Sequence, residues 1–140
     1  MNSKLTILVI EDDDVAAEAI DRSLKKHGVD VPTVHAENGA EALEILRGKS
    51  SKHVSGSPLV VLLDLNMPVM NGFEFLREVR SDPKLSSLVV FVLTTSDADA
   101  DRTRAYQEHV AGYMVKSAVG PQFGRLARLL DEYSKAVLLP

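Results

Sequence analysis

Acidic, hydroxyl and amino side chains follow short apolar runs at four points of the sequence. Glu11 and Asp12 follow the first run, Asp64 the third, Thr94 the fourth and Lys116 the fifth. Carboxylates held close together repel one another, and a hard divalent cation with oxygen ligands offsets that repulsion. An aspartate can also be the nucleophile in phosphoryl transfer, a step that depends on positioning and charge neutralisation. The pattern therefore predicts a Mg²⁺-dependent phosphoryl acceptor with Asp64 as the accepting residue.

The remaining polar residues have roles that suit this chemistry. Lys116 would neutralise one oxygen of the phosphoryl group, Thr94 would donate a hydrogen bond to another, and the metal would bridge the carboxylates to it. Each residue alone has a simpler interpretation: an aspartate after a strand is usually a turn or cap, and Thr94 could cap a helix. Asp13 or Asp14 fits a solvated first helical turn. The hypothesis rests on the joint placement of these residues at four strand ends.

Five apolar runs, mostly rich in Val, Ile and Leu, have the length and composition of strands buried on both faces. The segments between them have helical spacing, so strand and helix alternate five times. The polar stretch between Asp97 and His109 shows no clear period, and a helix is expected there because the alternation needs a crossover. The predicted strands are Leu5–Ile10, Val31–Ala36, Leu59–Leu63, Leu88–Leu93 and Gly112–Val115.

This alternation predicts an α/β fold with a parallel sheet, right-handed crossovers and helices on both faces. Five strands favour a flavodoxin-like, doubly wound (βα)5 arrangement with the strand order 2-1-3-4-5. Gly28, Asn38 and Asn71 mark helix boundaries, and the Ser- and Gly-rich segment Gly48–Pro58 is expected to be a mobile loop. Reactive groups in such sheets gather at the carboxyl ends of the strands, where the acids and Lys116 lie.

The composition predicts one domain over residues 1–140, with a core over about 4–133 and a short apolar tail over 134–140. The net charge of −4 argues against DNA as a partner, because the phosphate backbone is also negative. Without cysteine there is neither a disulfide framework nor a thiolate metal site. No apolar run is long enough for a membrane span or a signal peptide, so we expect a cytoplasmic protein.

The run Leu63-Asp64-Leu65-Asn66-Met67-Pro68 with Asn71-Gly72 resembles the phosphoacceptor signature of bacterial response-regulator receiver domains. The resemblance covers essentially the whole chain. It implies that a histidine kinase phosphorylates Asp64 and that the protein signals through protein–protein contacts. It also implies a role for each pocket residue: Glu11, Asp12 and Asp64 as metal ligands, the backbone carbonyl of Asn66 as a further ligand, Thr94 as the switch hydroxyl, Tyr113 as the aromatic that changes rotamer, and Lys116 as the phosphate-binding lysine.

Two positions depart from the family pattern. Glu11 stands where aspartate is more usual, so its longer side chain would reach the metal through a water or from a shifted angle. Ser117 replaces the proline that commonly follows the lysine, and a cis bond without proline is costly. The isomer of the Lys116–Ser117 peptide bond is left open.

A finer likeness concerns four segments: Leu93-Thr94-Thr95-Ser96, Ala105-Tyr106 followed by His109-Val110, Tyr113-Met114-Val115-Lys116-Ser117, and the Leu138-Leu139-Pro140 end. These segments are similar to single-domain regulators paired with bacterial phytochromes. The likeness implies a light-sensing kinase as donor and a homodimer formed by the fourth helix, fifth strand and fifth helix. The apolar tail points the same way, because exposed apolar groups often mark an interface.

Two other functions remain as alternatives. An aspartyl-phosphate phosphatase resembling the haloacid dehalogenase superfamily would need a second aspartate where Asn66 stands, and it would need room for a cap domain. A phosphorylation-independent interaction module on the same fold would tolerate loss of the acids that this sequence keeps. We expect no enzyme activity beyond the protein's own phosphorylation and autodephosphorylation. The four histidines lack ligand spacing, so they are expected at the surface or in loops and a zinc site is not predicted.

Overall fold

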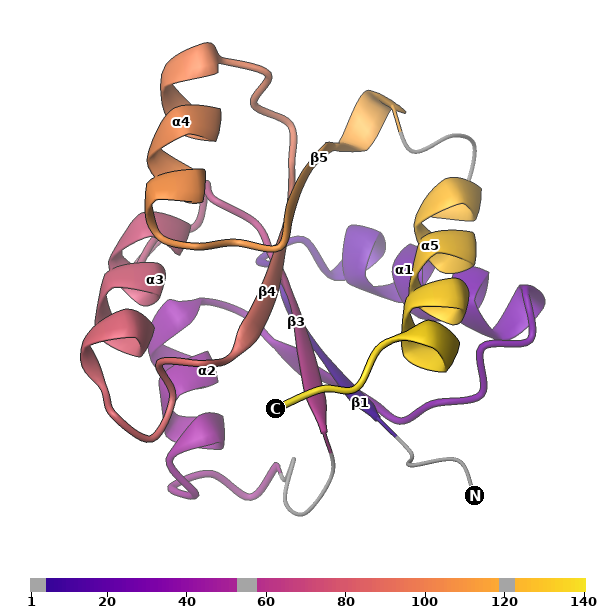
Figure 1. Cartoon of the computed structure of the whole chain (residues 1–140), viewed down its shortest axis with the longest axis horizontal. Coiled ribbons are helices and arrows are strands. Elements are labelled where there is room, and N and C mark those ends of the chain that lie inside the picture. The colour runs from indigo at the N-terminus through magenta and orange to yellow at the C-terminus, as the bar shows by residue number, and fades with distance from the viewer. Residues whose placement is uncertain (1–4, 53–57, 119–122) are drawn as a thin grey trace.

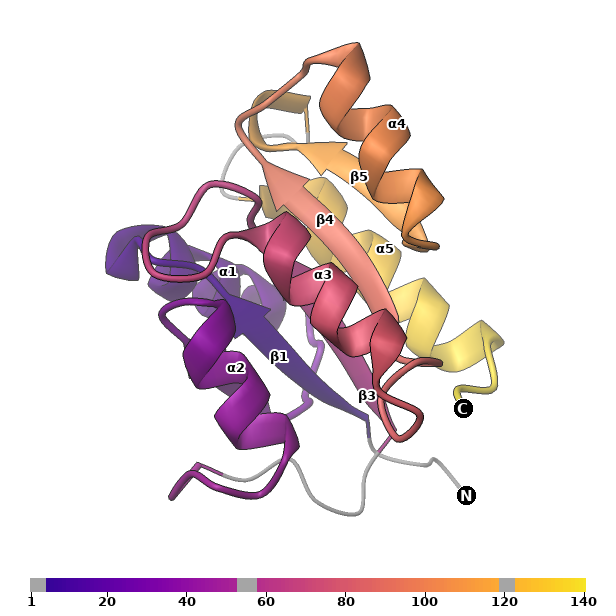
Figure 2. The same cartoon turned by 90° about the vertical axis from the view of Figure 1, so that its left-hand side faces the viewer.

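The computed structural model describes residues 5–52, 58–118 and 123–140. Five parallel strands form one twisted sheet in the order β2-β1-β3-β4-β5, which confirms the predicted flavodoxin-like topology (Figures 1 and 2). Each strand reads as a nearly continuous apolar run because helices cover both faces of the sheet. The strands are β1 (Thr6–Ile10), β2 (Thr33–Ala36), β3 (Leu59–Leu63), β4 (Val89–Thr94) and β5 (Gly112–Val115).

Five α-helices pack on the sheet in two layers. Helices α1 and α5 lie on one face, and α2, α3 and α4 lie on the other (Figure 1). The polar segment after β4 does form the crossover helix α4, as the alternation predicted. None of the helices in the described residues combines the length and apolar character needed to cross a bilayer. The helices are α1 (Asp14–Lys26), α2 (Gly39–Leu46), α3 (Gly72–Ser81), α4 (Asp99–Gln107) and α5 (Gly124–Ala136), and a 3₁₀ turn, η1 (Lys116–Ala118), follows β5.

Side-chain caps fix the starts of the first three helices. The Asp13 carboxylate accepts hydrogen bonds from the Val15 and Ala16 backbone N–H groups, so Asp13 caps α1 rather than joining the pocket. Asn38 caps α2, and Asn71 caps α3 in a reciprocal capping box. The helix boundaries predicted at these residues are confirmed.

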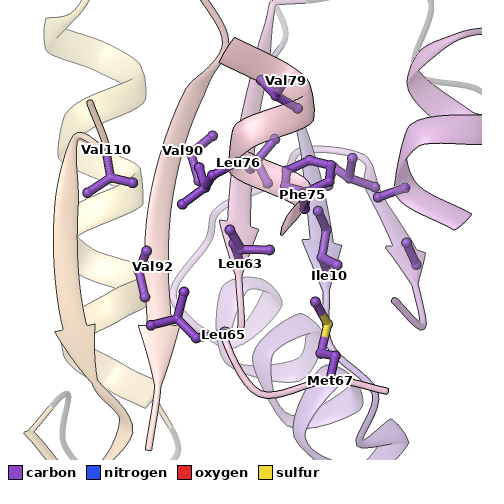
Figure 3. Close-up of a cluster of buried hydrophobic side chains, with 14 of the residues drawn as sticks. Ile10, Leu63, Leu65, Met67, Phe75, Leu76, Val79, Val90, Val92 and Val110 are labelled. Atoms are coloured by element: carbon purple, nitrogen blue, oxygen red, sulfur yellow. The ribbon is translucent and has the colours of Figure 1, made fainter. Parts of the chain in front are cut away.

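The two faces of the sheet build two apolar clusters. Alternate residues of one strand point to opposite faces, so Leu8 and Ile10 join the cluster under α2 and α3 while Ile7 and Val9 join the one under α1 and α5. Figure 3 shows the first cluster, in which Phe75 and Leu76 of α3 pack over the strands. All of these side chains are buried. The double-sided core holds the strand ends rigidly, and the polar residues follow those ends.

Four predicted strand boundaries differ from the structure. The first and fourth strands each begin one residue later than predicted, at Thr6 and Val89. The second strand begins at Thr33 instead of Val31, because Pro32 lacks an N–H group and contributes only its carbonyl, which accepts from Ile7. The fourth strand extends through Thr94, so the expected switch hydroxyl belongs to the strand itself. Residues 53–57 of the expected loop Gly48–Pro58 lie outside the described residues.

Candidate functional site

Three carboxylates meet at the carboxyl edge of the sheet. Strands β1 and β3 are neighbours with Ile10 opposite Leu63, so the residues that follow these strands come together. One carboxylate oxygen each from Glu11, Asp12 and Asp64 lie within 4.8 Å of one another. Glu11 and Asp64 are only 2% and 6% exposed, whereas Asp12 faces solvent. The predicted acidic cluster is therefore present, with an open side at Asp12.

Lys116 supplies the positive charge of this cluster. Its Nζ lies 2.7 Å from Glu11 Oε2 and 3.8 Å from Asp64 Oδ2. Lys116 directly follows β5, and β4 lies between β5 and β3 in the sheet. The lysine side chain therefore extends across the end of β4 to reach the acids. Among the described residues no other cation contacts these carboxylates.

The electrostatics of Glu11 reflect this crowding. Burial raises the pKa of Glu11 from 4.5 to about 7, the hydrogen bond from Lys116 lowers the pKa again, and the nearby charge of Asp64 raises it. Although the 2.7 Å contact with Lys116 favours the ionised carboxylate, burial outweighs that contact. One ammonium group thus balances only part of the charge of three carboxylates.

The donor set suits a hard divalent cation. Carboxylate oxygens are the ligands that Mg²⁺ and similar ions prefer, and a cation at this position would supply the charge that Lys116 alone does not. The Asn66 backbone N–H donates to Asp64 Oδ1 at 3.3 Å, which holds the loop after β3 against the cluster. The residues present fit a divalent metal.

Thr94 and Tyr113 form a second group beside the acids. Thr94 is fully buried at the end of β4, and Ala98, not Thr94, occupies the N-cap position of α4. The Ser96 N–H donates to Thr94 Oγ1 at 3.4 Å, and the Tyr113 hydroxyl donates to the Ser96 carbonyl at 3.0 Å. Burial raises the pKa of Tyr113. No hydrogen bond joins Thr94 to Asp64 in the described part of the chain, so Ser96 is the link between the two predicted switch residues.

The histidines are placed differently from the expectation in one case. His35 lies in the edge strand β2, half-buried, and its Nε2–H donates to the Glu11 carbonyl oxygen at 2.6 Å. It therefore holds the backbone of a pocket residue, which spacing along the sequence did not indicate. His27 and His109 lie at helix ends, and His53 is outside the described residues.

Gly72 is a pocket residue whose role the sequence did not indicate. Its N–H donates to the Leu65 carbonyl at 3.0 Å, and a Cβ added to it would lie 2.6 Å from the Asp64 carbonyl oxygen. Only glycine allows α3 to begin this close to the acceptor loop. The Asn71-Gly72 pair signalled a helix start, but the contact with Asp64 depends on the tertiary fold.

The peptide bond left open after β5 is trans. The described residues contain no cis peptide bond, and these include Lys116 and Ser117.

Comparison with known proteins agrees with this geometry. Residues 7–124 match the model of the response regulator receiver domain. Response regulator Rcp1 of Synechocystis sp. is 33% identical over 116 residues, which cover 83% of this chain and 79% of Rcp1. The structure of the phosphorylated cyanobacterial phytochrome response regulator RcpA has a TM-score of 0.85 and 32% identity, and the match covers 98% of this chain and 99% of that one.

A further structure bears on the metal. The Mn²⁺-bound form of response regulator Rcp1 matches with a TM-score of 0.81 and 29% identity, covering 96% of this chain and 98% of that one. A divalent cation in a similar protein agrees with the oxygen donors found at Glu11, Asp12 and Asp64. Receiver domains are generally signalling modules rather than enzymes. By its matched family model, its fold and its relatives, this chain belongs to the receiver domains of two-component response regulators.

Proposed function

We propose that a histidine kinase phosphorylates Asp64 in a Mg²⁺-dependent reaction and that the phosphorylated protein signals by binding other proteins. The observation that carries this proposal is the position of Asp64. Its own carboxylate is nearly buried beside those of Glu11, also buried, and Asp12, which faces solvent, and Lys116 Nζ is 3.8 Å away. Such a site combines a nucleophile with preorganised positive charge, which phosphoryl transfer requires.

Each residue has a separate task in the transfer. A carboxylate oxygen of Asp64 attacks phosphorus, the bond to the donor's imidazole nitrogen breaks, and that nitrogen keeps the bonding electron pair. Lys116 stabilises the charge on the phosphoryl oxygens, for which its ammonium group needs only to turn from Glu11 toward Asp64. Mg²⁺ would be held by Glu11, Asp12, Asp64 and the backbone carbonyl of Asn66, and it would neutralise the carboxylates and the incoming phosphoryl group.

The response is proposed to pass through Thr94, Ser96 and Tyr113. Thr94 would donate a hydrogen bond to the phosphoryl group, which draws the β4–α4 connection toward Asp64. Tyr113 is bonded to Ser96 in that connection, so its rotamer would follow the movement. Phosphorylation would thus shift a two-state equilibrium of the surface around α4 and β5. Beyond its own phosphorylation and autodephosphorylation we propose no catalytic activity.

The proposed setting is the cytoplasm, with a bacterial phytochrome-type histidine kinase as donor and no direct DNA contact. The likeness to a cyanobacterial phytochrome response regulator supports this donor, and the net charge of −4 disfavours DNA. Phosphotransfer profiling against the histidine kinases of the source organism tests the donor. Transfer from a phytochrome-type kinase at least tenfold faster than from the others is expected, and equal or slower transfer would contradict this assignment.

Replacing the acceptor tests the central proposal. Asp64→Asn should abolish labelling by acetyl phosphate in the presence of Mg²⁺, because the amide does not attack phosphorus, and excess chelator should abolish labelling of the unmodified protein. Asp30→Asn is the matched control, since Asp30 is exposed between α1 and β2 and away from the cluster. Intact mass and phosphate-affinity gels measure the label. A stoichiometric, base-labile phosphoryl group on the Asp64→Asn protein would overturn the assignment.

A further inference from the structure

Helix α4 packs beside the edge strand β5 (Figure 2), and it is held unevenly along its length. Its one buried side chain, Ala105, lies in its second half, and the neighbouring Arg104 places its guanidinium carbon 4.1 Å from the centre of the Phe73 ring in α3. In its first half, residues 99–103, every residue is exposed except Asp101, which is half-buried. Helices in proteins owe most of their stability to packing of an apolar face, so the first half of α4 is free to move at low cost.

The carboxyl end of α4 is anchored by Arg80 of α3. Its Nε donates to the Glu108 carbonyl at 2.7 Å and its Nη2 to the His109 carbonyl at 3.0 Å, and these two residues directly follow the helix. Its Nη1 donates to the carbonyls of Ser86 and Leu88, at 2.9 and 2.7 Å. Hydrogen bonds from a charged donor are stronger than neutral ones, so the guanidinium joins the end of α4 firmly to the segment that leads into β4.

The amino end of α4 is tied to the proposed switch through Ser96. The Ser96 hydroxyl donates to Asp101 Oδ2 at 2.6 Å and accepts from the Ala98 N–H at 3.3 Å. Its N–H donates to Thr94 Oγ1, and its carbonyl accepts from the Tyr113 hydroxyl. Every polar group of Ser96 is therefore bonded. Asp101 is the residue through which this network reaches the first turn of the helix.

We propose that the Ser96–Asp101 hydrogen bond transmits phosphorylation to α4, which pivots about the end that Arg80 anchors. This inference rests on the proposed function, in which Thr94 turns toward the phosphoryl group. Ser96 is two residues beyond Thr94, so it moves with the β4–α4 connection, and its short bond to a carboxylate draws the first turn of α4 along. Asp101 is thus a positioning residue. The surface that changes for a partner protein is the first half of α4, residues 99–103.

A ¹⁵N NMR titration of the full chain tests this link, with beryllofluoride in the presence of Mg²⁺ as the mimic of the phosphoryl group. In the unmodified protein the amides from Thr94 to Ser96 should shift, and those of residues 99–103 should shift with them. The amides of Glu108 and His109 should remain in place, because Arg80 holds the carbonyls of both residues.

Three variants examine the bond itself. Asp101→Ala should keep the shifts of the β4–α4 connection but lose those of residues 99–103. Asp101→Asn should retain both, because an amide oxygen still accepts from the Ser96 hydroxyl. Asp99→Ala is the matched control, since it removes a carboxylate from the same helical turn, one that pairs with Arg102. The control should respond to beryllofluoride as the unmodified protein does.

Ser96→Ala removes the same bond from its other side. This variant leaves the Asp101 charge at the start of α4, where the helix dipole favours it, so a loss of shifts at residues 99–103 would not reflect a weakened helix. Retention of those shifts in Asp101→Ala or Ser96→Ala, an equal loss in Asp99→Ala, or equally large shifts after the end of the helix would overturn the inference. No response anywhere in the unmodified protein would overturn the proposed function, and this inference with it.

Discussion

Two opposing effects act on the pKa of Glu11: burial and the ammonium group of Lys116. Their balance can be measured through the pH dependence of stability. Burial raises the pKa of Glu11 to about 7 despite the ammonium group of Lys116 at 2.7 Å. Between pH 4.5 and 7 the unfolded chain has released this proton while the folded chain retains it. Protonated Glu11 therefore favours the folded state over the unfolded one. This contribution to the unfolding free energy is complete below pH 4.5 and is lost as the pH rises through 7.

We predict that the metal-free protein loses on the order of 2–3 kcal/mol of unfolding free energy from Glu11 across this range. Urea unfolding at pH 5 and pH 7.5 in chelator measures the change. Glu11→Gln should flatten the dependence, because the amide does not titrate. Other carboxyls, such as Asp21 and Glu41, have a lowered pKa, so they change the unfolding free energy at lower pH and in the opposite direction. Both proteins contain these groups, so the difference between their pH dependences reports Glu11. Parallel curves for both proteins would contradict the assignment.

Lys116→Ala should keep the fold but slow phosphorylation by acetyl phosphate about a hundredfold, the loss typical of one preorganised charge in the transition state. The fold is expected to survive because Glu11, already easily protonated, can become neutral when its partner is removed. Initial rates of labelling measure the effect. Lys25→Ala is the control, since that lysine is exposed and pairs with Asp21. Equal rates for the unmodified protein and Lys116→Ala would remove Lys116 from the mechanism.

At the scale of elements, the connection from β3 to α3 decides where Asp64 lies. α3 begins at Gly72, where an added Cβ would come within 2.6 Å of the Asp64 carbonyl oxygen and 2.8 Å of Leu65 Cα. Both contacts are with backbone, which a side-chain rotation does not relieve. The capping box of Asn71 and Glu74 fixes the start of the same helix through reciprocal side-chain to backbone hydrogen bonds.

Gly72→Ala should therefore destabilise the protein by about 2 kcal/mol, the cost of overpacking, and should slow phosphorylation by displacing Asp64. Thermal unfolding and labelling rates measure the two effects. Gly124→Ala is a matched control, since Gly124 is also the first residue of its helix but an added Cβ meets nothing closer than 3.8 Å. That change should be neutral or slightly stabilising. Similar effects from both substitutions would show that loss of glycine, not the contact, matters.

At the scale of the whole molecule, the tail after α5 is divided between two environments. Leu139 packs against the core cluster under α1 and α5, whereas Leu138 is 98% exposed. Part of the tail thus folds back onto its own domain at Leu139, and only the remaining exposed part is left to form an interface. Tyr106 of α4 and Leu129 of α5 are also exposed apolar side chains. We propose residues 1–140 as one receiver unit with its core over about 4–133 and the tail 134–140 assisting a homodimer.

Light scattering after size exclusion should show a dimer of the full chain at tens of micromolar. A chain ending at Lys135 should dissociate more readily, and Leu138→Ser should do the same while leaving Leu139 packed. The single substitution separates the interface from the stability that Leu139 contributes. A monomer for the full chain with and without phosphodonor would end the proposal, and a dimer unaffected by either change would exclude the tail from the interface.

The sequence alone determined the architecture and which side chains gather at the carboxyl edge of the sheet. Helices cover both faces of the sheet, so each strand is a nearly continuous apolar run. The spacing of apolar residues and the composition therefore identify the five strands. The crossover rule then predicts α4, even though that helix buries only Ala105 and has no apolar stripe of its own. Once strands are placed, the rule that carboxyl ends share one edge brings Glu11, Asp64 and Lys116 together.

Only the tertiary structure decided how these residues balance one another. The pKa of Glu11, the closer approach of Lys116 to Glu11 than to Asp64, and the bond from His35 to the Glu11 carbonyl depend on burial and on contacts between distant segments. The steric need for Gly72 against Asp64 is of the same kind. Sequence periodicity reports which face of an element is buried. It does not report distances between side chains of different elements, and electrostatic energies and steric contacts depend on those distances.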